Sequence, residues 1–195
     1  YRLGDFYEMF FEDAKLVSQE LDLVLTGRSA GVEEKVPMCG IPFHAANSYI
    51  QRLVKKGYKV AICEQLEDPS SAKGLVDRGI IKIITPGTYM DATMDAKSTN
   101  YMASCDVSSF EITVIYCELS TGELKYQTLQ RSLVALQKAL LEQNVSELVC
   151  PMTMDKKWMA ALEEMDTMLI SKHKKANIDS EDLPLLNGIE SESLK

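Results

Sequence analysis

The residues best suited to chemistry lie at the start of the chain, where Phe6 and Glu8 are separated by one residue. Positions i and i+2 of an extended strand point to the same face, whereas in a helix they lie on nearly opposite sides. If residues 4–8 are extended, the Phe6 ring and the Glu8 carboxylate can reach one object together. A ring stacks on the face of a flat heterocycle while a carboxylate meets its edge, so the pair predicts contact with such a group.

The elements that must position this pair follow from the hydrophobic pattern. Apolar residues recur at helical spacing, or close to it, in four segments: 10–21, 46–56, 132–143 and 156–164. Strands are predicted at 23–25, 36–38, 58–65, 79–84, 101–107, 111–119, 123–129, 147–150 and 167–170. This order predicts an α/β fold with helices packed against sheets. The polar residues from 172 onward show no periodicity and are predicted to be loop or disordered.

A change in sequence character near residues 86–98 predicts a domain boundary. The run Thr85-Pro86-Gly87-Thr88 is a turn signal, and residues 90–97 lack apolar periodicity. We therefore expect two α/β domains, residues 1–91 and 98–195. Gly40, Pro42, Pro86 and Gly87 are expected to shape turns.

Composition narrows the class of protein without identifying a partner. The chain is 46% hydrophobic and 26% charged, and no apolar run approaches the length of a membrane span. Its five cysteines are scattered, without zinc-ligand spacing, so free buried thiols in a reducing cytoplasm are expected. A net charge of −8 does not exclude a local basic face, because salt at 0.1 M screens charges beyond about 10 Å. Because the chain starts at Tyr1, we expect it to be a piece of a longer protein.

Further motifs follow Phe6 and Glu8 in a fixed order. Residues 38–45 read MCGIPFHA and residues 60–65 read VAICEQ; Asp68-Pro69, Lys73-Gly74, Arg78 and Thr85-Pro86-Gly87-Thr88 follow. In this order and spacing, residues 1–91 resemble the N-terminal domain of the MutS family of DNA mismatch repair proteins. Residues 98–195 are more loosely similar, through residues 119–123, to that family's connector domain. The resemblance implies a mixed-sheet mismatch-recognition domain followed by a ribonuclease H-like α/β connector domain.

The resemblance implies a role for each residue of the opening pair. Phe6 would wedge into a duplex from the minor groove and stack on a mispaired base, and Glu8 would hydrogen-bond to that base. Unstacking costs a few kcal/mol, less at a defective pair, while base–aromatic stacking returns roughly 1–3 kcal/mol. A mismatch would thus be read as an easily deformed step. Phosphate repulsion and burial both favour a protonated Glu8, so we hypothesise that it donates a hydrogen bond.

The resemblance also implies contacts and partners beyond the pair. Basic residues at matching places approach the DNA backbone, so Arg28, Lys73 and Arg78 are predicted phosphate contacts. The parent protein would be a cytoplasmic, homodimeric, ATP-dependent sensor of mismatches or small loops in double-stranded DNA, with a connector able to dock a MutL-like repair protein. No Gly-x-x-x-x-Gly-Lys-Ser/Thr phosphate loop occurs in this sequence. ATP and magnesium are therefore expected only in the parent, and this segment is expected to bind DNA without catalysis, metal or cofactor.

Two alternatives remain open. The first is a family member with an architectural or junction-binding role, although the retained Phe6 and Glu8 argue against it. The second is a metal-dependent nuclease using Asp106, Glu111 and Glu118 on predicted strands. Two-metal hydrolysis needs carboxylates that converge on ions ~3.5–4 Å apart. Glu111 and Glu118 are an odd number of residues apart, so a regular strand points them to opposite faces.

Overall fold

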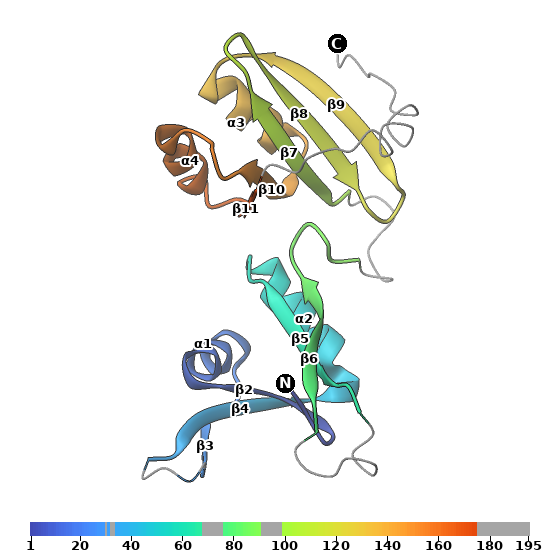
Figure 1. Cartoon of the computed structure of the whole chain (residues 1–195), viewed down its shortest axis with the longest axis vertical. Coiled ribbons are helices and arrows are strands. Elements are labelled where there is room, and N and C mark those ends of the chain that lie inside the picture. The colour runs from blue at the N-terminus through green and yellow to red at the C-terminus, as the bar shows by residue number, and fades with distance from the viewer. Residues whose placement is uncertain (30, 32–33, 68–75, 91–98, 175–195) are drawn as a thin grey trace. The chain divides into compact units, whose positions relative to one another are not determined.

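The structure is a computed structural model that describes residues 1–29, 31, 34–67, 76–90 and 99–174 (Figure 1). The chain divides after Thr85 into two compact units, Tyr1–Thr85 and Pro86–Lys195. Each unit contains its own sheet and its own hydrophobic core. The fold is therefore mixed α/β with several sheets, as the sequence predicts.

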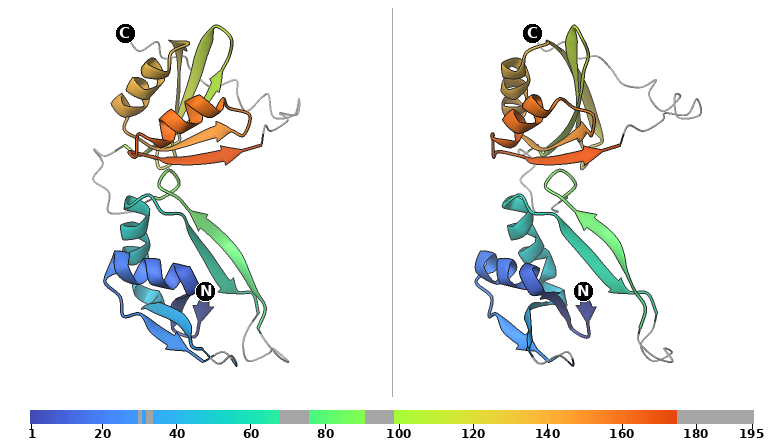
Figure 2. Two further views of the ribbon diagram at one scale, coloured as in Figure 1. Left: turned by 90° about the vertical axis from the view of Figure 1, so that its left-hand side faces the viewer. Right: turned by 60° about the vertical axis from the view of Figure 1, so that its left-hand side comes forward.

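The first unit is built on a four-stranded antiparallel sheet. Its strands lie in the order β1 (Arg2–Leu3), β2 (Phe6–Phe10), β4 (Val36–Pro42) and β3 (Thr26–Arg28). Helix α1 (Phe11–Leu21) packs across one face of this sheet, as Figure 2 shows. Ala14 and Val17 of α1 form a buried cluster with Cys39 of β4, and Met9 of β2 packs against it. The core thus lies on the face that carries the odd-numbered residues of β2.

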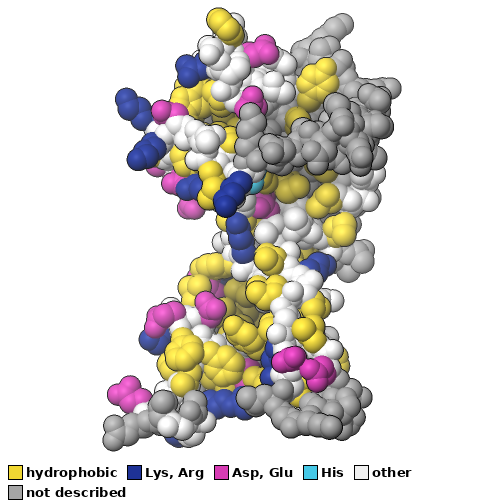
Figure 3. Space-filling model, in the orientation of Figure 1, with side chains coloured by type: hydrophobic (Ala, Val, Ile, Leu, Met, Phe, Trp, Pro, Cys, Tyr) yellow, Lys and Arg dark blue, Asp and Glu magenta, His cyan; other side chains and the backbone are white. Residues whose placement is uncertain are grey.

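A second helix and a two-stranded ribbon complete this unit. A short 3₁₀ turn η1 (Phe43–Ala45) leads into helix α2 (Ala46–Lys55), whose Leu53 joins the core of α1. Strands β5 (Val60–Gln65) and β6 (Arg78–Ile84) then pair antiparallel. Ile80, Ile81 and Ile83 of β6 are exposed. Hydrophobic side chains are visible over this part of the unit in Figure 3.

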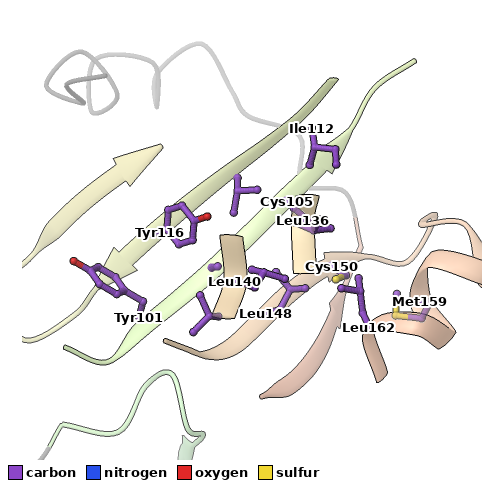
Figure 4. Packing of buried hydrophobic residues seen from close by; sticks show 13 residues of the cluster. Tyr101, Cys105, Ile112, Tyr116, Leu136, Leu140, Leu148, Cys150, Met159 and Leu162 are labelled. Atoms are coloured by element: carbon purple, nitrogen blue, oxygen red, sulfur yellow. The ribbon is translucent and has the colours of Figure 1, made fainter. Parts of the chain in front are cut away.

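The second unit is a five-stranded sheet in the order β11-β10-β7-β8-β9. Strands β7 (Tyr101–Val107), β8 (Glu111–Glu118) and β9 (Glu123–Gln130) form an antiparallel meander. Strand β10 (Val145–Pro151) pairs parallel to β7, and β11 (Leu169–His173) pairs parallel to β10. Helices α3 (Leu133–Glu142) and α4 (Lys156–Glu163) provide the two crossovers. Figure 4 shows Leu136 and Leu140 of α3 beside the buried side chains of the sheet.

Three sequence expectations about these elements are wrong. Residues 23–25 do not form a strand; the strand begins at Thr26, where pairing with Met38 of β4 starts. Gly40 lies within strand β4 and not in a turn. Lys172 and His173 belong to β11, because they pair with the end of β10, although their local sequence is polar. Lys174 follows the strand, and residues 175–195 of the predicted tail lie outside the described residues.

Candidate nucleic-acid interface

Phe6 and Glu8 share the face of β2 that the helices leave uncovered. Phe6 lies opposite Pro42 and Glu8 opposite Gly40, whereas Met9, at an odd-numbered position, packs into the core. A Cβ placed on Gly40 would lie 3.6 Å from Cγ of Glu8 and 3.9 Å from Cδ1 of Phe6. Both side chains therefore flank the same glycine on β4. Phe6 and Glu8 thus lie in an extended strand, the conformation in which both can reach one object.

Phe6 is an exposed aromatic residue in a regular strand. It has 47% of its surface accessible, although phenylalanine is usually among the most buried residue types. The backbone beneath it is held on both sides, by pairing of Phe6 with Leu3 of β1 and with Pro42 of β4. The strand therefore presents an accessible ring from a fixed backbone position, which suits stacking on a flat group.

Glu8 is bonded to Arg28, which lies on strand β3. Nη1 of Arg28 donates to Oε2 of Glu8 at 2.7 Å. The Glu8 side chain is 16% exposed and that of Arg28 is 50% exposed. The structure thus brings together three of the five predicted site residues, but it gives Arg28 a carboxylate partner that the sequence did not predict.

The opposite side of β2 fastens the strand to the rest of the unit. The hydroxyl of Tyr7 donates to the Glu64 carboxylate of β5, and burial is the largest cause that raises the pKa of Tyr7, followed by this hydrogen bond. The Arg2 guanidinium carbon lies 3.7 Å from the centre of the Phe43 ring and 5.7 Å from that of Tyr7. The roles of Arg2, Phe43 and Glu64 could not be predicted from the sequence, because these contacts depend on tertiary pairing and have no local signature.

Of the other two predicted phosphate contacts, the structure describes only Arg78. Arg78, at the start of β6, donates through Nε to the carbonyl oxygen of Arg2 at 3.3 Å and through Nη1 to that of Val76 at 3.1 Å. Its guanidinium therefore has a structural use within the unit. Lys73 lies outside the described residues.

The carboxylates of the nuclease alternative do not converge. Glu111 is exposed at one end of β8, whereas Glu118 is buried at the other end and accepts hydrogen bonds from Ser120 and Thr121. Within the described ranges, no three His, Cys, Asp or Glu residues are grouped closely enough to hold a metal ion. The part of the chain that the structure describes therefore has no carboxylate cluster of the kind that two-metal hydrolysis needs.

No helix within the described ranges has the length and apolar character needed to cross a membrane.

The comparisons with known proteins all indicate one family. Residues 1–93 match the family model for MutS domain I. A DNA mismatch repair protein MutS from Clostridium botulinum (strain Loch Maree / Type A3) is 53% identical over 157 residues, which are 75% of this chain and 17% of that protein. The DNA mismatch repair protein MutS of Clostridium tetani is 46% identical over 178 residues, 90% of this chain and 20% of that protein. The chain thus spans no more than about a fifth of the length of these curated relatives.

Proposed function

The chain belongs to the MutS family, with residues 1–93 matching MutS domain I, and on that premise we propose that it recognises mispaired bases in double-stranded DNA. In this proposal Phe6 is the wedge that stacks on a mispaired base, and Glu8 hydrogen-bonds to the same base. The ligand is duplex DNA containing mismatches or small loops.

One observation carries the proposal: an exposed ring and a carboxylate flank Gly40 on the open face of a well-paired strand. Stacking is most favourable if the ring is already fixed, because immobilising a free side chain on binding costs about 0.5–1.5 kcal/mol. The pairing of β2 on both edges fixes the backbone that carries the ring. A base stacked on Phe6 would then present its edge within reach of Glu8.

Phosphate contacts from Arg28, Lys73 and Arg78 remain part of the proposal. They would supply the salt-dependent, sequence-independent share of the affinity. Arg78 would have to serve DNA while holding two backbone carbonyls. Arg28 has two possible roles, as a phosphate contact or as the partner of Glu8, and mutation can separate them.

We propose that residues 1–91 are the recognition domain and residues 98–195 a ribonuclease H-like connector domain. The antiparallel meander followed by two parallel crossovers in the second unit supports this assignment. The chain would bind DNA without catalysis. The complete cytoplasmic protein would be a homodimer that uses ATP and magnesium elsewhere in its length and docks a MutL-like partner through the connector.

The proposed wedge can be tested by fluorescence anisotropy with the full-length protein that carries this chain, using G·T-mismatched and matched duplexes. Phe6→Ala should remove most of the mismatch preference, because stacking worth about 1–3 kcal/mol per base corresponds to roughly 5–150-fold in affinity. Weak binding to the matched duplex should survive. Phe110→Ala is the matched control, since Phe110 is a 90% exposed phenylalanine of the other unit. A mismatch preference that Phe6→Ala leaves intact would favour the architectural or junction-binding alternative.

A further inference from the structure

We propose that Arg28 is a positioning residue for Glu8, which it holds as a charged hydrogen-bond acceptor beside Phe6, and that it is not primarily a DNA-backbone contact. The inference rests on the proposed mismatch recognition. It assigns the chemistry of the hydrogen bond between Glu8 and the mispaired base. It replaces the phosphate role that the family resemblance implies for Arg28.

The register of the sheet places Glu8 between Arg28 and Phe6. Arg28 pairs with Val36, Glu8 with Gly40 and Phe6 with Pro42. These three partners lie an even number of residues apart on β4, so all three side chains share one face. Arg28 therefore approaches Glu8 from the end of β2 that is away from Phe6. In this direction it can orient the carboxylate without covering the ring.

Gly40 keeps this arrangement open. A Cβ at position 40 would make ordinary contacts with the Glu8 side chain at 3.6 Å and with the Tyr7 carbonyl oxygen at 3.5 Å. A larger side chain would rise from the sheet directly opposite Glu8, in the row between Arg28 and Phe6. The glycine thus leaves the surface beside the carboxylate free for the guanidinium on one side and for a ligand on the other.

The pair leaves half of the carboxylate for a ligand. Arg28 occupies Oε2 of Glu8, and Oε1 has no hydrogen-bond partner among the described residues. An ionised carboxylate only accepts hydrogen bonds, through two oxygens with about four lone-pair positions. Its free oxygen therefore suits a base that presents a ring N–H, such as thymine at N3 or guanine at N1.

The guanidinium also explains how an acidic residue is tolerated near DNA. A lone carboxylate brought close to phosphates is repelled, and that repulsion favours its protonated form. The Arg28 guanidinium, bonded to the Glu8 carboxylate at 2.7 Å, compensates the negative charge of that carboxylate locally. The structure thus assigns Glu8 an acceptor role, in place of the protonated donor expected from its sequence context alone.

A double-mutant cycle with Arg28→Gln and Glu8→Ala in the full-length protein tests the assignment. Affinity for matched and G·T-mismatched duplexes is measured by anisotropy across a salt series. Arg28→Gln should lower the mismatch preference about tenfold, which corresponds to about 1.4 kcal/mol, while the salt dependence of matched binding stays unchanged. In the Glu8→Ala background the same change should have little further effect, because coupled residues are not additive.

Controls separate this inference from the proposed function. Lys15→Gln removes the same charge from another ion pair, with Glu12 on helix α1, and should leave the mismatch preference unchanged. Arg28→Lys keeps the charge at position 28 and should retain most of the preference, which excludes a folding defect as the cause. Phe6→Ala, measured in parallel, shows whether the mismatch site itself operates.

Two results would overturn the role of Arg28. If Arg28→Gln lowered the affinity for matched and mismatched duplexes equally, and reduced the slope of log affinity against log salt by about 0.9, Arg28 would be a phosphate contact. A preference that Arg28→Gln leaves intact while Phe6→Ala abolishes it would also remove the assignment. If the wild-type protein showed no mismatch preference at all, the proposed function would fail before the inference about Arg28.

Discussion

At the scale of the residue, Glu8 is bonded to a partner that lies twenty positions away along the chain. The identity of Glu8 and its proximity to Phe6 could be predicted, because both follow from alternation along one strand. The Arg28 contact could not, because it requires the register of β3 on β4 and of β4 on β2. Local sequence carries no information on that register, and the family resemblance implies only a phosphate contact for Arg28.

Glu8→Gln separates an acceptor role from a donor role. The substitution would keep the size of the side chain but remove the charged pair with Arg28, so the preference for G·T-mismatched DNA should fall severalfold in the anisotropy measurement. Glu12→Gln is the control, because it removes the carboxylate of an ion pair on α1, outside the proposed site. Mismatch affinity that is unchanged in Glu8→Gln would instead support a protonated Glu8 that donates to the base.

At the scale of the element, each unit shows where local pattern suffices and where it does not. Helix α3 was predictable because its apolar spacing and the Ser132 cap agree. Strand β3 was misplaced because Leu23, Val24 and Leu25 are apolar, yet the chain pairs with β4 only from Thr26 onward. The hairpin of β8 and β9 was predictable from the turn at residues 120–122, but the buried carboxylate that holds this turn was not.

Glu118 makes the stability of this hairpin pH-dependent. Hydrogen bonds, the largest from the Thr121 side chain and others from Ser120 and the backbone, hold the pKa of the Glu118 carboxyl below its usual range although burial opposes them. A lowered folded-state pKa stabilises the unit above the unfolded-state value of about 4.3, and this stabilisation is lost as pH falls through the folded-state value.

Glu118→Gln should therefore lower the Tm of the second unit at pH 7. The difference in Tm between this variant and wild type should shrink as the pH is lowered below about 4, since the wild-type carboxylate then becomes protonated. Thermal melts followed by circular dichroism between about pH 7 and about pH 3 measure both effects. Glu111→Gln, at the exposed end of the same strand, should change the Tm little at either pH. A deficit that stays constant with pH would show that Glu118 acts by shape alone.

At the scale of the whole molecule, the boundary between the units is marked by specific bonds. The backbone N–H of Gly87 donates to Oε2 of the buried Glu147 on β10 at 3.1 Å, and the Ser171 hydroxyl of β11 donates to Oε1. The side-chain amide of Asn100 donates to the Pro86 carbonyl oxygen at 2.8 Å. The turn predicted at residues 85–88 coincides with the division of the chain after Thr85, and its glycine is also required by close packing within the second unit.

Gly87→Ala should destabilise the second unit. The added Cβ would lie 2.8 Å from Cβ of Glu147, closer than such atoms approach, and 3.0 Å from Cβ of Met102, which is a tight contact. We therefore expect a loss of about 1–3 kcal/mol. Urea unfolding followed by Trp158 fluorescence reports this directly, because Trp158 is the single tryptophan and packs on the core of that unit. Gly40→Ala, whose Cβ makes only ordinary contacts in the first unit, is the control. Equal midpoints for Gly87→Ala and wild type would contradict the packing argument.

The exposed isoleucines of β6 bear on how this chain behaves at high concentration. Strand β6 pairs only with β5 among the described strands, and an apolar edge strand is a template for pairing between molecules. The net charge of −8 provides the repulsion that keeps copies apart, and this repulsion acts over only about 3 Å in 1 M salt. Concentrated stocks should therefore stay monodisperse longest in dilute buffer, even though high salt is the usual choice for stripping DNA from such a protein.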